Sequence, residues 1–292
     1  MSRAAKLKSE QPAERARILK VTPDEYHRDP CETPSLSSSI AHTLITRSPA
    51  HAHLRHPRLG NQPAAPTDPM NEGHLIHRLL LGKGTEVEVI AGFADFRKMA
   101  ARDARDAAIE AGRVPMLEHK YAALLAAAEA LHGQIRGYDI DLNGESEIAI
   151  EWRELGNIGD VLCRGLLDHL VIDRAVIYDV KKIRSADLRT CARHAIEYGY
   201  DIQRAAYVSA VEKLRPDLAG RVDFVWLFCE LEPPYAVVPA RPDGALRELG
   251  EMRWQRAVGL WEHCLSHGYW PTYTNAITTI EAPPWALAQE SF

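Results

Sequence analysis

The chain has 292 residues, 46% of them hydrophobic and 26% charged, which is ordinary for a globular protein and long enough for one large domain or two small ones. No apolar run reaches the ~18 residues that a membrane-spanning helix needs, and the polar N-terminus lacks the apolar core of a signal peptide. The net charge of -5 is unusual for a protein that binds nucleic acid over a broad surface, so any DNA contact should be local or built by assembly.

The five cysteines are scattered along the chain and form no Cys-x-x-Cys pair. They are Cys31, Cys163, Cys191, Cys229 and Cys264. This spacing predicts neither a zinc ribbon nor a disulfide framework, and it fits a reducing, cytoplasmic location.

The first half of the chain is predicted to be mainly helical. Serine caps, apolar spacing and proline positions are the signals used. Helices are expected at residues 35–45, from Ser48-Pro49 onward, at 72–82 and, as a pair separated near Val114-Pro115, between about 95 and 132.

The second half alternates strands with helices. The run SEIAIEW (146–152) alternates strictly between polar or small and large apolar side chains, which predicts a strand. Further strands are expected in VLCRGLLDHLVI, AVIYDVKK, VDFVWLFCEL and YAVVPA, and helices over about 186–214 and 243–267. The pattern predicts a mixed α/β (α+β) fold with one central mixed β-sheet flanked by helices. Residues 1–21 are expected to be a flexible N-terminal tail and residues 22–292 a single domain with a helical N-terminal part.

The strand VIYDVKK (176–182) carries an acid and a lysine two residues apart. Because side chains alternate along a strand, Asp179 and Lys181 share one face, while Val176, Tyr178 and Val180 point to the other. One interpretation is a weak ion pair on a solvent-facing edge. The other depends on which side chains the neighbouring strands bring to the same face.

A hairpin would bring further carboxylates to this face. If Asp173 and Arg174 form a two-residue loop, Asp168 lies opposite Asp179. A short connection through 155–160 would then place Glu147 beside Asp168. Crowded carboxylates share protons or hold a cation, and an all-oxygen set suits Mg²⁺ or Mn²⁺. The alternative is that Glu147 and Asp168 lie on a solvated face.

Taken in order, these motifs resemble the PD-(D/E)XK nuclease superfamily, in particular its branch of phage-type exodeoxyribonuclease VIII (RecE) and RecB-type nuclease domains. The resemblance covers about residues 22–288 and implies a PD-(D/E)XK restriction-endonuclease-like core. The matching segments are EGHLIHRLLLG with His77, GESEIAIEW with Glu147, CRGLLDHLVIDRAVIYDVKK with Asp168, Asp179 and Lys181, and YGYDIQRAAYVSAV with Gln203 and Tyr207. The sequence departs from the family where Lys182, Ile183 and Arg184 replace small hydroxyl residues after Asp-x-Lys.

The resemblance implies a role for each matching residue. Asp168 and Asp179 would hold the metal, Glu147 would bind it directly or through water, and the Val180 carbonyl and His77 would complete the set. Lys181 would orient and help deprotonate the attacking water, or steady the charge on the phosphate. The alternative for His77 is a packed or surface histidine.

Gln203 and Tyr207 are four residues apart and therefore neighbours on one helix face. The resemblance implies that they contact DNA near the site. The alternative is that Tyr207 belongs to the hydrophobic core.

The function implied by the resemblance is a Mg²⁺-dependent (or Mn²⁺-dependent) DNA exonuclease that acts on duplex ends in phage-type recombination. A single-strand annealing protein is the expected partner, a ring-shaped homo-oligomer the expected assembly, and no membrane is involved. An endonuclease or structure-specific nuclease on the same fold is one alternative, and a non-catalytic DNA-end-binding module is another.

Overall fold

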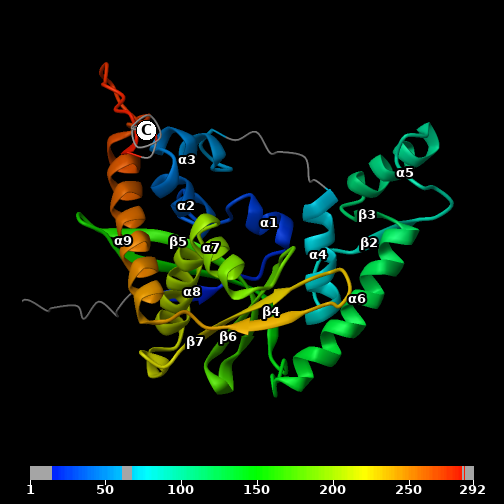
Figure 1. Cartoon of the computed structure of the whole chain (residues 1–292). Helices are drawn as coiled ribbons and strands as arrows, with labels where there is room; N and C mark the ends of the chain where they lie inside the picture. Colours follow the sequence, from blue (N-terminus) through cyan, green and yellow to red (C-terminus); the bar gives the residue numbers. More distant parts are fainter. Residues whose placement is uncertain (1–14, 61–67, 285, 287–292) are drawn as a thin grey trace, which may run out of the picture.

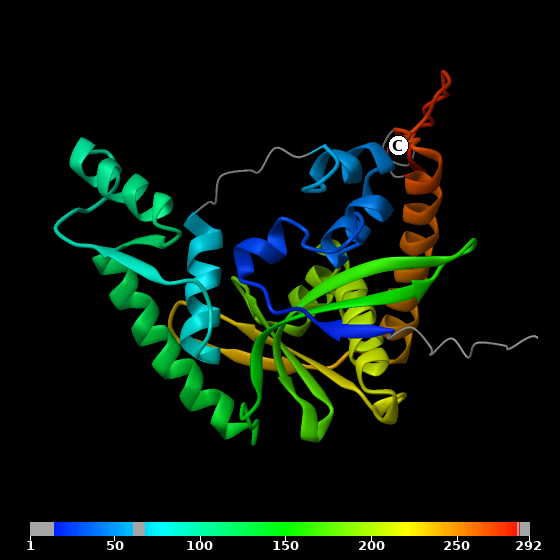
Figure 2. The same ribbon diagram turned by 180° about the vertical axis from the view of Figure 1, so that it is seen from behind.

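The computed structural model describes residues 15–60, 68–284 and 286 (Figure 1). Most of the predicted tail therefore lies outside the described residues. Its last part is not flexible as predicted, because Ala16–Ile18 forms the strand β1, which pairs with the central sheet (Figure 2). The domain thus begins before the predicted boundary at residue 22.

A six-stranded sheet in the order β1-β4-β5-β6-β7-β8 forms the centre of the fold. Its further strands are β4 (Glu145–Leu155), β5 (Asp160–Val171), β6 (Val176–Lys182), β7 (Asp223–Cys229) and β8 (Val237–Ala240). Neighbouring strands are antiparallel except for the parallel pair β6–β7. The predicted mixed central sheet is confirmed.

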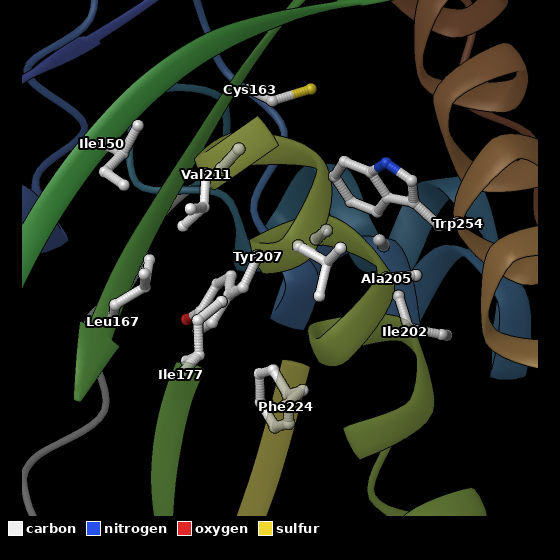
Figure 3. Close-up of a cluster of buried hydrophobic side chains, with 14 of the residues drawn as sticks. Ile150, Cys163, Leu167, Ile177, Ile202, Ala205, Tyr207, Val211, Phe224 and Trp254 are labelled. Atoms are coloured by element: carbon white, nitrogen blue, oxygen red, sulfur yellow. The ribbon is translucent and has the colours of Figure 1, made fainter. Parts of the chain in front are cut away.

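Helices cover the two faces of the sheet and form two main cores, one on each face. The helices are α1 (Pro23–His27), α2 (Ser38–Thr46), α3 (Pro49–Arg55), α4 (Asp68–Leu81), α5 (Met99–Glu110), α6 (Glu118–Gly137), α7 (Leu188–Glu197), α8 (Tyr200–Leu214) and α9 (Gly244–His267). On one face α2, α8 and α9 pack on the sheet, with side chains of α8 against Ile150, Leu167 and Phe224 (Figure 3). On the other face α4 and α6 pack on Tyr178 and Val180 of β6. None of the helices within the described residues is both long and apolar enough to cross a bilayer.

The predicted helix starts are confirmed where a serine caps them. Ser37 accepts a hydrogen bond from the backbone N–H of Ile40 at the start of α2, and Ser48 does the same for His51 at the start of α3. The helix predicted over 186–214 is instead two helices, α7 and α8. Gly199 separates them with φ 73°, and the His42 ring lies 2.6 Å from where a Cβ would stand.

The predicted break near Val114-Pro115 is a short strand. Val114–Leu117 (β3) pairs in parallel with Val87–Ile90 (β2), and this two-stranded sheet is separate from the central one. Together with α5 it forms an excursion of the chain between α4 and α6, which lies beside α4 and away from the central sheet (Figure 1).

The strand registers are those that the site requires. His169 pairs with Tyr178, which fixes the predicted alignment of β5 with β6, although the loop spans residues 172–175 and not two residues. Between β4 and β5, Ser146 pairs with His169 and Ile148 pairs with Leu167. Glu147 therefore lies opposite Asp168. Its φ of 55° interrupts the ladder there.

A buried ionic cluster ties the segment before α2 to β5. Asp29 is 4% exposed, and its carboxylate accepts hydrogen bonds from the backbone N–H (2.9 Å) and hydroxyl (2.7 Å) of Ser35. His56 Nε2 and an Arg164 guanidinium nitrogen each lie 3.3 Å from it. Burial raises the pKa of Asp29, but His56, Arg164 and Ser35 outweigh burial and lower it to about 2.

This cluster predicts a loss of stability in acid. An unfolded Asp has a pKa near ~3.9, so the folded state keeps its charge at a pH where the unfolded state takes up a proton. The stabilisation by Asp29 should therefore be complete above about pH 5 and fall as the pH drops towards 2. The full loss is about 2.5 kcal/mol, and roughly half of it should have occurred by pH 3. The free energy of unfolding in urea, measured for wild type and Asp29→Asn at pH 7 and pH 3, tests this loss. Equal pH dependence in the two proteins would contradict this role of Asp29.

Candidate active site

The predicted site residues meet where β5 and β6 diverge. Beyond the His169–Tyr178 pair, Asp168 Oδ2 accepts a hydrogen bond of 2.9 Å from the backbone N–H of Val180. A carboxylate thus bridges the two strands where the backbone ladder ends. The Asp168 side chain is 13% exposed, which argues against the solvated-face alternative for this residue.

Asp179 and Lys181 form an ion pair inside the protein. Lys181 Nζ lies 2.6 Å from Asp179 Oδ2, and the Asp179 side chain is fully buried while that of Lys181 is 14% exposed. The Lys181 ammonium also lies 4.6 Å from the ring centre of Tyr200 at the start of α8. The interpretation as a solvent-facing edge pair is therefore excluded.

The charges of this pair are shifted by burial and by each other. Burial raises the pKa of Asp179 to about 6, the Lys181 ammonium opposes this rise, and the Asp168 carboxylate adds to it. Burial alone would lower the pKa of Lys181, but the charges of Asp179 and Asp168 outweigh it and raise that pKa. Lys181 is therefore held as an ammonium group.

Glu147 belongs to the same cluster from the side of β4. It is half-buried and lines a cleft together with Asp168 and His77. Burial raises the pKa of Glu147, and the Asp168 carboxylate adds to the rise. The structure thus brings Glu147 near the other acids, as the register predicts, while direct metal ligation by Glu147 stays a prediction.

His77 reaches the site from α4. Its Nε2 lies 2.9 Å from the carbonyl oxygen of Val180, and its Nδ1 lies 3.6 Å from Asp168 Oδ2. Of the two interpretations for this histidine, its position favours membership of the site over packing or surface exposure.

The donor atoms fit a hard divalent cation. Among the described residues, no three His, Cys, Asp or Glu side chains already surround a common metal position. Apart from its ion pair, however, neither buried oxygen of Asp179 accepts a hydrogen bond, so this carboxylate has unused ligand capacity. His77 Nε2 and the Val180 oxygen lie 2.9 Å apart, which is a hydrogen-bond distance, so His77 would bind a metal through this nitrogen only after giving up its proton. Asp168, Asp179, Val180 and His77 could therefore hold such an ion.

Tyr207 is part of the core. It is 5% exposed and packs against Gly165, where an added Cβ would lie 2.7 Å from the ring (Figure 3 shows Tyr207 among the core side chains). Burial raises the pKa of its hydroxyl, and a hydrogen bond from Gln203 opposes the rise. This position favours the packing alternative for Tyr207. A DNA contact of the half-buried Gln203 stays a prediction.

A cleft of about 780 Å³ opens in front of the site and has two walls that the sequence did not predict. One wall comes from α1 with Pro23, Asp24 and His27, and the other from the excursion between α4 and α6, with Phe96, Arg105, Ile109, Arg113 and Pro115 among its lining residues. Tyr200, which contacts Lys181, was also missed. These are single residues on helices, loops and a short strand, and none of them belongs to a spacing pattern that would have revealed its position.

The sheet, its flanking helices and the Asp-x-Lys strand define a PD-(D/E)XK nuclease fold, as the motifs predict. Residues 37–281 match the family described as "PDDEXK-like domain of unknown function (DUF3799)", and the chain belongs to this family. Nucleases of this fold generally use divalent metal ions.

Two solved structures are similar to the chain. One is a candidate exonuclease from Eubacterium rectale, with 12% sequence identity, a TM-score of 0.56, and coverage of 94% of this chain and 99% of that one. The other is a phage-related exonuclease from Haemophilus somnus 129PT, with 14% identity, a TM-score of 0.33, and coverage of 80% and 96%. The first supports the fold alone. No curated protein matches the chain.

Proposed function

We propose that this protein is a divalent-metal-dependent DNA nuclease, and that it degrades linear duplex DNA from its ends. The observation that carries the proposal is the convergence of the Asp179–Lys181 ion pair with Asp168 and His77. Asp168 and His77 also line the cleft. The family resemblance favours an exonuclease. An annealing partner and a ring-shaped homo-oligomer stay predictions of that resemblance.

The proposed chemistry is hydrolysis of a phosphodiester bond. Asp168, Asp179, the Val180 carbonyl and His77 would hold a divalent ion, which when bound supplies charge neutralisation at the phosphate and acidifies a water molecule. Lys181, held between Asp179 and the ring of Tyr200, carries a positive charge 2.6 Å from Asp179 Oδ2. From there it can orient the attacking water and stabilise charge that builds on the phosphate.

Glu147 would act from β4, on the side of Asp168 that is opposite to β6. Because it lines the cleft and its pKa is raised by burial, it can accept a hydrogen bond from a water molecule beside Asp168 and share a proton with that water. In the absence of a bound cation, the carboxylates of Glu147 and Asp168 in the cleft would repel a phosphate backbone. Activity should therefore depend strictly on the metal.

Incubation of the purified protein with linear and circular duplex DNA, each with Mg²⁺, Mn²⁺ or EDTA, tests the proposal. Loss of linear DNA alone, only in the presence of metal, is the expected result. Nicked or cut circles would replace the exonuclease by an endonuclease. No cleavage of either substrate with either metal would overturn the nuclease proposal and leave the DNA-end-binding alternative.

A further inference from the structure

The wall of the cleft formed by the excursion takes no part in the proposed chemistry. This wall is built from residues before β2, the loop before α5, α5 itself and the start of β3, and it lines the same cleft as His77 and Asp168. The segment pairs only β2 with β3 and does not join the central sheet. The excursion therefore shapes the cleft, while its side chains, all within the described residues, contribute nothing to the two main cores.

Phe96 and Arg105 form a cation–π pair on this wall. The Arg105 guanidinium carbon lies 5.8 Å from the centre of the Phe96 ring. Asp106 pairs with the guanidinium: Arg105 Nε donates to Asp106 Oδ1 at 2.8 Å, and a second guanidinium nitrogen lies 2.8 Å from the same oxygen. Arg105 thus contacts both Phe96 and Asp106.

Packing does not explain Phe96. The three hydrophobic clusters formed by the described residues do not include it, although it is only half-exposed and lines the cleft. An aromatic ring beside a guanidinium is a surface on which nucleobases stack, and stacking tolerates any base sequence.

The charge of this wall favours stacking over phosphate binding. Arg105 is paired with Asp106, and a guanidinium nitrogen of Arg113 donates to Glu88 at 2.6 Å. Both cations are thus largely neutralised by their partners. A wall of this kind attracts a phosphate backbone weakly, so its contact with nucleic acid should come from base faces.

The size of the cleft is consistent with a single strand. About 780 Å³ falls within the ~300–1,000 Å³ of sites that bind small molecules, so the cleft has room for a few nucleotides of one strand. A base can stack on the pair only when it has left its partner in the duplex.

We propose that Phe96 and Arg105 form a stacking site for an unpaired nucleobase, so that the strand to be cut reaches the acidic end of the cleft as a single strand. The proposal rests on the proposed nuclease function. It assigns to the excursion between α4 and α6 the role of binding the separated strand.

Binding of short oligonucleotides, measured by fluorescence anisotropy with Ca²⁺ and again with EDTA, tests this site without cleavage. Phe96→Ala should raise the Kd for a single-stranded oligonucleotide by roughly 5-fold to 100-fold, the size of one lost stacking contact. Phe96→Trp should bind like wild type. Met99→Ala is the matched control, because Met99 is a 72% exposed apolar residue of the same excursion that is absent from the cleft lining.

An oligonucleotide of abasic sites separates stacking from phosphate binding. It should bind wild type and Phe96→Ala equally, because it carries no base to stack. Equal affinity of the two proteins for the normal oligonucleotide, or no binding by wild type under both conditions, would overturn the stacking site. Phe96-dependent binding by a protein that cleaves no DNA would support the site and overturn only the nuclease function.

Discussion

Replacing Asp168 with asparagine is expected to lower the rate of DNA cleavage by roughly 10³-fold, because the proposed mechanism makes Asp168 a metal ligand worth several kcal/mol in the transition state. Asparagine has nearly the same shape, and its side-chain oxygen can still accept the hydrogen bond from Val180 that spans 2.9 Å in the wild type. The negative charge is the main property removed. The fold and its thermal stability should therefore change little.

Initial rates on linear duplex DNA with Mg²⁺, together with a thermal unfolding curve, measure this effect. Asp160→Asn is the matched control: Asp160 is the exposed first residue of the same strand, β5, and it lies outside the cleft. A rate for Asp168→Asn within about tenfold of wild type, with the control also active, would remove Asp168 from the metal site.

Val180 connects the parts of this site. Its N–H donates to Asp168, its carbonyl oxygen lies 2.9 Å from the His77 ring, and its side chain is buried in the second core. Asp179 and Lys181 flank it on the opposite face of β6. The backbone position of one buried strand residue thus orients groups from α4, β5 and β6, and packing of α4 on β6 is a condition for the site geometry.

The part of the site that lies on strands could be predicted from the sequence. The alternation of β6 places Asp179 and Lys181 together, and this follows from a period of two alone. The predicted alignment of Asp168 with Asp179 is correct although the loop is longer than predicted. The loop gains one residue from each strand, Ile172 from β5 and Ala175 from β6, so the register does not shift.

Features that depend on tertiary contacts could not be predicted in this way. Glu147 has a left-handed backbone, a conformation that a sequence usually indicates by glycine or asparagine and not by glutamate. The close packing of the His42 ring from α2 against Gly199 brings together residues far apart in the chain. Phe96 enters the cleft from a loop without periodicity, so its position follows from how the excursion packs and not from a pattern.

Replacing Lys181 with methionine is expected to reduce kcat by roughly 10²- to 10³-fold, which is typical for the loss of one group that stabilises transition-state charge. Methionine keeps the unbranched stem, which can still pack near Tyr200, so the substitution removes the ammonium group with little loss of volume. Because the proposed mechanism places Lys181 against the reacting water and phosphate, KM should change much less than kcat.

The neighbouring lysine provides the matched control. Lys182 points to the opposite strand face and donates to Glu72 of α4, a partly exposed pair whose loss should cost at most about 1 kcal/mol. Lys182→Met should therefore retain most of the activity, and circular dichroism should show both variants folded. Equal rates for the two variants would mean that the charge of Lys181 has no part in hydrolysis, and that the ion pair with Asp179 serves only to hold β6 in place.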